Sequence, residues 1–245
     1  FRLFNLKKNI LVFKHMASQN PGIFRDFAES QNISFHEVDL HAGEQIPDLK
    51  NYDGLWVMGG SMNVWEEDKY PWGIDEKKAI REAVQDLKMP FLGICLGHQL
   101  VAEALGGRAE KTENHEVGLF EIKPTKEGLN HPFLRDFKVS DKWVNVHLVE
   151  VTRPPKGAII LASSDRCVNH VMQISKNAFS CQFHPEACSH TLEGWMQIPG
   201  VPLAIEDLLG KEGVDAFERD FESNLMENKR ASHTLFKNWC ELVFQ

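Results

Sequence analysis

The sequence predicts an α/β fold built on a mostly parallel β-sheet. Short runs of apolar and β-branched residues alternate with longer stretches in which apolar residues recur at helical spacing. One apolar run stops at Gly59-Gly60, and another passes straight into a helical stretch through the segment 93–97. The chain has 245 residues, of which 42% are hydrophobic and 25% charged, values that are ordinary for a globular protein. Alternation, glycine-bounded strands and globular composition together favour this class.

The first half of the chain reads as strands and helices in turn. We expect strands at residues 9–14, 33–38, 55–58 and 91–94. We expect helices at residues 22–31, 75–88 and 98–105. Apolar residues lie at helical spacing on one face of the first two helices, and Pro90 and Gly106-Gly107 mark helix ends. Because each helix connects two strands, these segments predict parallel crossover units.

The second half changes character, with strand-like runs separated by turns that carry proline and glycine. These runs are residues 119–122, 143–146, 158–162, 168–174 and 179–183. From Pro202 onward the pattern is helical, and its two apolar stripes are interpreted as core contacts. Since no repeat or low-complexity linker interrupts the chain, we expect a single domain over 1–245, with a core of about 8–198 and a helical extension of about 199–245.

Charge and cysteine usage limit the function and the compartment. With 27 basic and 35 acidic side chains the formal net charge is −8, which argues against a general nucleic-acid binder. The apolar runs are too short to span a membrane, and no signal segment is evident at the start of the sequence. Five cysteines at uneven spacings do not suggest a disulfide framework. We therefore expect a cytoplasmic protein with free thiols.

The segment 91–99 has the form of a nucleophile elbow. A strand enters a helix through Gly93-Ile94-Cys95-Leu96-Gly97, a Gly-x-Cys-x-Gly junction. The two glycines leave room for the sharp turn, and the helix that begins after Cys95 favours a thiolate by placing its positive dipole end near the sulfur. The backbone N–H of Leu96 is placed to donate to a developing oxyanion. A buried, inert cysteine in a tight turn is the alternative interpretation.

A base for this cysteine is expected 89 residues downstream. His184 follows the last predicted strand in the run Phe183-His184-Pro185-Glu186, and active sites of α/β sheets lie at strand ends. Glu186 could hold the imidazole in one tautomer as the third member of a triad. His98 is a less favoured base, because it lies within the helix start beside the elbow. Zinc at Cys181, His184, Cys188 and His190 is disfavoured, because this spacing matches no strong zinc motif and would use the expected base.

These segments resemble the signature of the class I (triad) glutamine amidotransferases, and the chain is similar to free-standing members that look like the glutaminase part of GMP synthetase. The segments that carry the resemblance are Met58-Gly59-Gly60-Ser61, Gly93 to Gln99 and Phe183 to Glu186, in the family's order. The resemblance implies a three-layer, flavodoxin-like sheet with a nucleophile elbow. It covers most of the chain.

The resemblance also implies roles for individual residues. Cys95 would be the nucleophile, His184 the general base and acid, and Glu186 the residue that orients His184. The oxyanion hole would be formed by the N–H groups of Gly60 and Leu96. Residues expected to border the substrate are Gly59, Gln99, Val146 and His147. No cofactor and no metal is expected.

The implied reaction hydrolyses the γ-amide of glutamine through a γ-glutamyl thioester on Cys95, giving glutamate and ammonia. The ammonia would pass to a separate ATP-dependent synthetase, since a glutaminase domain with a helical tail accounts for the chain length. A homodimer is compatible with the sequence. The alternatives are a γ-glutamyl hydrolase or peptidase with the same triad, and a catalytically silent regulatory or binding member. A dienelactone-hydrolase-like enzyme is disfavoured, because its acid would precede the histidine.

The sequence departs from the family pattern at two points. GMP-synthetase-like members carry a His followed two positions later by Asp, whereas here His147 is followed by Val149. Ser61 stands where many members have proline. The charged segment Trp65 to Trp72 resembles the free-standing subgroup, and it is interpreted either as a lid or as a solvated loop.

Overall fold

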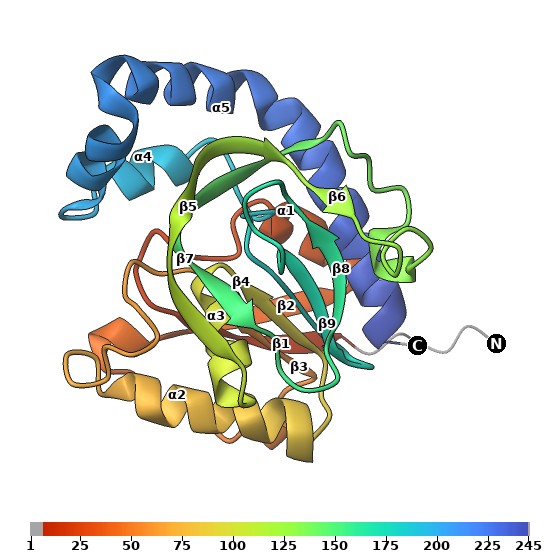
Figure 1. Ribbon diagram of the computed structural model, residues 1–245. Helices are drawn as coiled ribbons and strands as arrows, with labels where there is room; N and C mark the ends of the chain where they lie inside the picture. The colour runs from red at the N-terminus through yellow and green to blue at the C-terminus, as the bar shows by residue number, and fades with distance from the viewer. Residues whose placement is uncertain (1–6, 245) are drawn as a thin grey trace.

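The computed structural model describes residues 7–244, and its centre is an eight-stranded sheet (Figure 1). The strand order is β2-β1-β3-β4-β10-β9-β8-β6. The strands are β1 (Lys8–Lys14), β2 (Ile33–Asp39), β3 (Gly54–Val57), β4 (Phe91–Ile94), β6 (Lys123–Pro124), β8 (Ile159–Ser163), β9 (Val171–Ser175) and β10 (Ala178–Cys181). The neighbours from β2 to β10 pair in parallel, and β9, β8 and β6 continue the sheet antiparallel. The prediction of an α/β fold with a mostly parallel sheet is confirmed.

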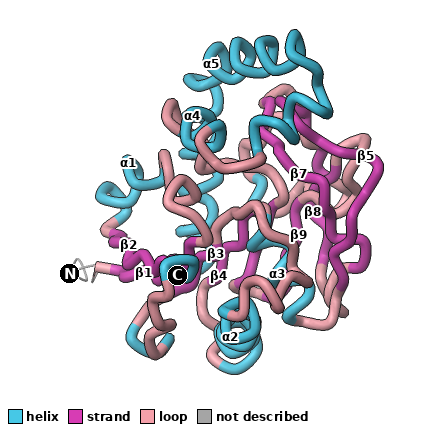
Figure 2. Tube along the Cα trace, turned by 90° about the vertical axis from the view of Figure 1, so that its left-hand side faces the viewer, coloured by secondary structure: helices cyan, strands magenta, loops and turns pink. Residues whose placement is uncertain are grey.

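Helices cover both faces of the sheet and give three layers. They are α1 (Phe24–Ala28), α2 (Trp72–Arg81), α3 (Leu96–Ala104), α4 (Thr191–Met196) and α5 (Val201–Val243). Alternate residues of β1 face opposite layers: Ile10 and Val12 pack with α1 and the end of α5, and Leu11 and Phe13 pack with α2 and α3. Figure 2 shows α2 and α1 on opposite sides of the strands. Because alternate side chains of β1 face opposite sides of the sheet, the helices that pack on them form two layers.

A separate two-stranded ribbon stands beside the sheet. Strands β5 (Arg108–Glu121) and β7 (Lys142–Arg153) pair antiparallel and are longer than the runs 119–122 and 143–146 that the sequence predicts. The apolar run of β5 is confined to residues 117–120, and residues 110–116 before it are polar, so the pairing of that part leaves no apolar signal in the sequence.

The helix boundaries differ from the sequence prediction in two places. The helix expected over 22–31 is an α-helix only at Phe24–Ala28 and continues as a 3₁₀ turn at Glu29–Gln31. The helix expected over 75–88 begins at Trp72 and ends in a π turn at Glu82–Asp86. Both segments keep the predicted apolar face, so the error lies in the terminal turns, where alternative hydrogen bonding costs little.

The C-terminal helix α5 crosses much of the molecule (Figure 1). It is broken at Gly210, whose φ of 69° and ψ of 166° are not helical. Beyond the break, Phe217 and Phe221 pack against α4 and the ribbon, while Leu235 and Trp239 pack on the sheet face shared with α1. Both predicted apolar stripes are thus core contacts. In the described part of the chain, no helix is both long and apolar enough to cross a membrane.

Candidate active site

Cys95 lies at a strained turn between β4 and α3. Its φ of 52° and ψ of −103° are unusual for a residue with a side chain. A Cβ on Gly97 would approach the carbonyl oxygen of Val57 to 2.0 Å, and a Cβ on Gly93 would approach the carbonyl oxygen of Gly97 to 2.6 Å. Both glycines are therefore required for close packing of strand and helix, as the elbow interpretation predicts.

The sheet brings His184 to this elbow. Strand β10 pairs parallel with β4, Cys181 standing opposite Ile94, and the N–H of Cys95 donates to the carbonyl of Cys181 at 2.9 Å. The chain beyond β10 then runs beside Cys95, and the N–H of His184 donates to Val144 O at 2.9 Å. Parallel pairing thus places two segments 89 residues apart at the same edge of the sheet.

Glu186 is hydrogen bonded to His184 as the sequence interpretation expects. The distance from His184 Nδ1 to Glu186 Oε1 is 2.6 Å, and the side chains are almost completely buried. The Trp195 ring of α4 meets the imidazole edge-on, with ring centroids 4.6 Å apart. With Nδ1 bound to the carboxylate and one ring edge covered, the imidazole is fixed in orientation, and Nε2 remains for chemistry.

The electrostatics of His184 favour a charged imidazolium. Burial lowers the pKa of His184, but the Glu186 carboxylate and the neighbouring Cys95 outweigh it and raise the pKa to about 10. At neutral pH the ring therefore carries a proton next to the sulfur. A protonated imidazole beside the sulfur can donate that proton to a leaving group.

A cavity of about 400 Å³ opens onto Cys95. Of the residues predicted to border the substrate or form the oxyanion hole, Gly60, Gln99, Val146 and His147 line it. Gly59 does not line it; its carbonyl oxygen is turned to His15, at 2.8 Å from Nδ1. Leu96 opens helix α3 directly after Cys95. Within residues 7–244, neither the N–H of Gly60 nor that of Leu96 has a hydrogen-bond acceptor.

Two glutamines join the elbow to the cavity wall. Gln99 Nε2 donates to the carbonyl of Val149 at 3.0 Å and to Oε1 of Gln182 at 3.2 Å. Gln182 Nε2 in turn lies 3.7 Å from the sulfur of Cys95. Gln182 was missed in the sequence, although it directly precedes the Phe183-to-Glu186 run. Its amide is a donor to the sulfur, which stabilises negative charge there.

His147 is held by a buried carboxylate behind the cavity. Glu116 Oε2 accepts from Nε2 of His147 at 2.9 Å and from Nε2 of His170 at 2.8 Å, and Ser164 donates to its other oxygen. Burial would raise the pKa of Glu116, but these bonds from both histidines dominate and hold it well below its usual range. Glu116, in β5, and His170, directly before β9, were missed, because neither segment carries a motif.

Two groups of residues have the side chains that metal ions prefer. Glu116, His147 and His170 offer three ligand atoms within 4.8 Å of one another, the only such grouping among residues 7–244. The N···O distances of 2.8 and 2.9 Å are hydrogen-bond lengths. They are explained by two imidazole N–H groups that donate to one carboxylate. The disfavoured zinc set of Cys181, His184, Cys188 and His190 is not brought together by the described chain.

Two further segments line the cavity, the charged segment 65–72 and the start of α5. The charged segment contributes Glu66, Lys69 and Tyr70, so part of it faces the site rather than solvent alone. The start of α5 contributes an apolar wall. Its residues are Val201, Ala204, Ile205 and Leu208. The sequence left the charged segment open between a lid and a solvated loop, and it did not place the start of α5 at the cavity, because that contact depends on the path of the chain and not on local pattern.

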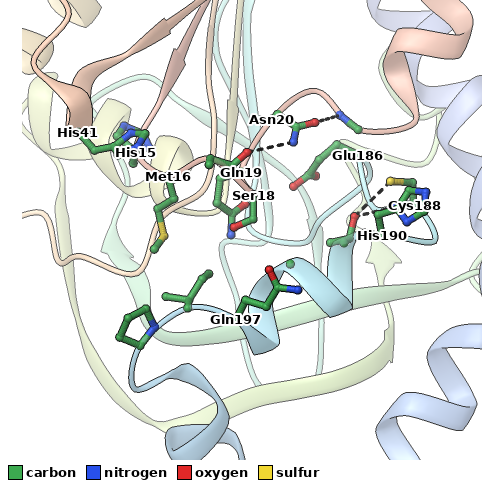
Figure 3. Close-up of a pocket in the computed structure, with 16 residues that line it drawn as sticks. His15, Met16, Ser18, Gln19, Asn20, His41, Glu186, Cys188, His190 and Gln197 are labelled. Carbon is green, nitrogen blue, oxygen red and sulfur yellow. Dashed lines mark hydrogen bonds between the residues drawn. The ribbon is translucent and has the colours of Figure 1, made fainter.

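Glu186 lines a second cavity, of about 540 Å³ (Figure 3). Its lining near Glu186 is polar, with Ser18, Gln19 and Asn20 from the loop after β1 and Cys188 from the loop after β10. Figure 3 shows the Glu186 side chain between these two loops. The two cavities share Pro199 in their walls, and Glu186 lines only this second one.

The remaining cysteines are poor nucleophile candidates. All five thiols are free. Burial raises the pKa of Cys181, of Cys167 and of Cys240, in the last case to about 12. Such thiols stay protonated and unreactive at neutral pH. Cys188 is the most accessible and lies in the second cavity, away from the elbow.

The chain is similar in sequence to proteins named as glutamine-hydrolysing GMP synthase subunits. The chain is 36% identical over 163 residues to a glutamine-hydrolysing GMP synthase subunit of Sulfolobus acidocaldarius, covering 66% of this chain and 81% of that protein. It is 37% identical over 168 residues to the corresponding protein of Saccharolobus solfataricus, covering 67% and 84%.

Solved structures share the whole fold. A glutamine amidotransferase from Thermotoga maritima superposes with a TM-score of 0.81 at 26% identity, covering 96% of this chain and 99% of that one. A second, from Methylobacillus flagellatus, gives a TM-score of 0.81 at 25% identity, covering 98% and 96%. The family model of class-I glutamine amidotransferases matches residues 15–196, which include the elbow and the His184–Glu186 pair. The chain therefore belongs to the class-I glutamine amidotransferase family.

Proposed function

We propose that this protein hydrolyses the γ-amide of glutamine through a thioester on Cys95 and delivers the ammonia to a separate synthetase. The observation that carries the proposal is the meeting of three features: the strained elbow at Cys95, the 2.6 Å bond between His184 and Glu186, and a cavity that opens on the sulfur. Nucleophile, proton carrier and orienting group are then within one site.

The first half-reaction forms the thioester. Cys95 Sγ attacks the carbonyl carbon of the amide, and the oxygen takes the negative charge within reach of the N–H groups of Gly60 and Leu96. When the C–N bond breaks, His184 gives its proton to the nitrogen, which leaves as ammonia. Glu186 keeps the ring oriented throughout, and Gln182 donates to the sulfur when it carries charge.

The second half-reaction restores the enzyme. His184, now neutral, takes a proton from water, and the hydroxide attacks the thioester carbon. The C–S bond breaks, glutamate leaves, and the thiolate and the imidazolium are regenerated. The sum is glutamine plus water giving glutamate plus ammonia, with no cofactor. The acceptor of the ammonia would be aminated by an ATP-dependent synthetase, as the names of the related GMP synthase subunits suggest.

Purified protein with glutamine tests the hydrolysis, with ammonia and glutamate measured separately. An electrophilic glutamine analogue, followed by intact mass, tests the nucleophile: wild type should gain one adduct and Cys95→Ser none. Cys188→Ser is the matched control, since Cys188 is the most accessible other thiol and should leave labelling unchanged. Labelling of Cys95→Ser to the wild-type extent would overturn the assignment of Cys95.

A γ-glutamyl hydrolase acting on larger amides is the second candidate. The observation that favours it is the apolar wall from the start of α5, which could receive a substituent on the amide nitrogen. Turnover of γ-glutamyl amides and peptides is compared with turnover of free glutamine. Strong turnover of the peptides with none of glutamine would replace the first function by the second.

Delivery of ammonia has its own test. An ATP-dependent synthetase from the same genome is added, and glutaminase activity and amination of its acceptor are followed together. Stimulation of both by the pair supports transfer. Hydrolysis that the synthetase never changes, with no amination from glutamine, would contradict it.

A further inference from the structure

A second buried histidine–carboxylate pair lies next to the candidate active site and has no role in the proton transfers above. His15 follows β1, Glu76 lies in α2, and their side chains are completely buried. The distance from His15 Nε2 to Glu76 Oε1 is 2.7 Å. The Trp72 ring stacks on His15, with centroids 5.3 Å apart and planes 24° from parallel. A carboxylate and an aromatic plane therefore fix this imidazole.

The other ring nitrogen of His15 faces the backbone of the active-site loop. Nδ1 lies 2.8 Å from the carbonyl oxygen of Gly59. A carbonyl can only accept, so Nδ1 must carry a hydrogen. Burial lowers the pKa of His15, but Glu76 and the Gly59 carbonyl outweigh it and the pKa is raised. The geometry thus makes Nδ1 a donor to the Gly59 carbonyl and Nε2 the partner of Glu76.

This bond acts on the orientation of the Gly60 N–H. In a trans peptide the carbonyl of one residue and the N–H of the next point in opposite directions, and residues 7–244 contain no cis peptide. With the Gly59 carbonyl held by His15, the Gly60 N–H points to the other side. Gly60 lines the cavity with Cys95, and a Cβ there would lie 2.7 Å from Leu96 Cδ2, so it adjoins the other oxyanion donor.

The Gly59–Gly60 peptide needs such a restraint. Neither residue has a side chain, so rotation of this peptide meets little of the steric barrier that other residues impose. The Gly60 N–H has no acceptor among the described residues that could hold it instead. The hydrogen bond from His15 is therefore the contact that selects one peptide orientation.

We propose that His15 is a positioning residue: held by Glu76 and Trp72, it fixes the Gly59–Gly60 peptide so that the Gly60 N–H points at the substrate oxygen that becomes negative. The inference rests on the proposed function, because it requires a reaction with an oxyanion. It goes beyond that function by assigning the pre-organisation of the oxyanion hole to a pair on β1 and α2.

The matched variants differ in which ring nitrogen they replace. His15→Gln places an amide nitrogen near Nε2 and leaves the Gly59 carbonyl without its donor. His15→Asn places an amide nitrogen near Nδ1 and keeps that donor. Glu76→Gln keeps the Nδ1 donor as well, because the Gln amide can donate to an unprotonated Nε2. Removing one oxyanion donor costs ~10²–10³-fold in kcat, so partial misorientation should cost about 10–100-fold.

We expect His15→Gln to lower kcat about 10–100-fold with KM within about twofold of wild type, since the donor acts on the transition state. His15→Asn and Glu76→Gln should recover most of kcat. Circular dichroism and Tm establish that each variant is folded. A kcat for His15→Gln within about twofold of wild type, or equal losses in all three variants, would overturn the positioning role.

A crystal structure of His15→Gln gives a readout that needs no turnover. We expect the Gly59–Gly60 peptide to be rotated or to occupy two orientations, whereas His15→Asn keeps the wild-type one. An unchanged single orientation in His15→Gln overturns the inference whatever the activity. Absence of wild-type turnover on every γ-glutamyl substrate would instead refute the proposed function, and the peptide orientation would still decide the role of His15.

Discussion

The buried pairs His184–Glu186 and His15–Glu76 have similar geometry but different neighbours. His184 and Glu186 are two residues apart, their N···O distance is 2.6 Å, and His184 adjoins Cys95. His15 and Glu76 are 61 residues apart, their N···O distance is 2.7 Å, and His15 adjoins a backbone carbonyl. In both pairs the carboxylate raises the pKa of the histidine. Because His184 faces the sulfur and His15 faces a backbone carbonyl, we expect the first to move a proton and the second to hold a peptide.

The largest expected effect is from removing the imidazole that faces the sulfur. His184→Ala should lower kcat about 10³–10⁴-fold, because both half-reactions pass a proton through this ring. Steady-state kinetics with glutamine measure it. His36→Ala, on the edge strand β2 with its ring bonded to Tyr52, is the matched control and should leave kcat unchanged. Comparable losses in both variants would mean that the effect does not come from the active site.

The paired glutamine substitutions of the two carboxylates test the comparison directly. Glu186→Gln should lower kcat at least about 10²-fold, because the amide no longer stabilises the imidazolium that must form. Glu76→Gln should retain most of kcat, because the Gly59 carbonyl keeps its donor. The kcat and KM of both variants, measured at the same pH, test this order of effects. The reverse order of effects would exchange the roles of the two pairs.

The charge of His184 should also appear in stability. Its pKa is about 10 when folded and about 6.5 when unfolded, so the folded state holds a proton that the unfolded state has released. This stabilisation is complete below about pH 6.5 and is lost as the pH rises through about 10. The Tm should therefore fall as the pH rises between these values. His184→Gln should show a smaller fall; an equal fall would contradict the assignment.

The smallest effect is expected from substituting Glu116, the buried carboxylate that holds His147. Glu116→Gln loosens His147, which lines the cavity but has no place in the proton transfers. We expect KM for glutamine to rise about 3–10-fold with kcat nearly unchanged. Substrate titrations of wild type and variant measure both constants. A fall in kcat larger than the rise in KM would show that His147 takes part in the chemistry.

The predictability of these groups follows their separation along the chain. The elbow is one continuous strand-turn-helix segment, and His184 and Glu186 are nearly adjacent, so both were predicted from the sequence and lie together in the structure. The His15–Glu76 contact joins the loop after β1 to α2, and the Glu116–His170 contact joins β5 to the loop before β9. These segments are far apart along the chain and meet only in the folded protein. A single His or Glu in such an element carries no local pattern, and so these groups were not predicted.

The sequence by itself determined the α/β class, the order of strands and helices in the first half of the chain, the family, and the identity of the nucleophile, base and orienting acid as candidates. Each of these depends on local periodicity or on short runs of residues. Only the tertiary structure decided that β10 pairs with β4 and so brings His184 to Cys95, that α5 walls the cavity, and that His15 holds Gly59. Strand pairing and side-chain contacts between distant segments depend on the packing of the whole chain, and no short segment encodes them.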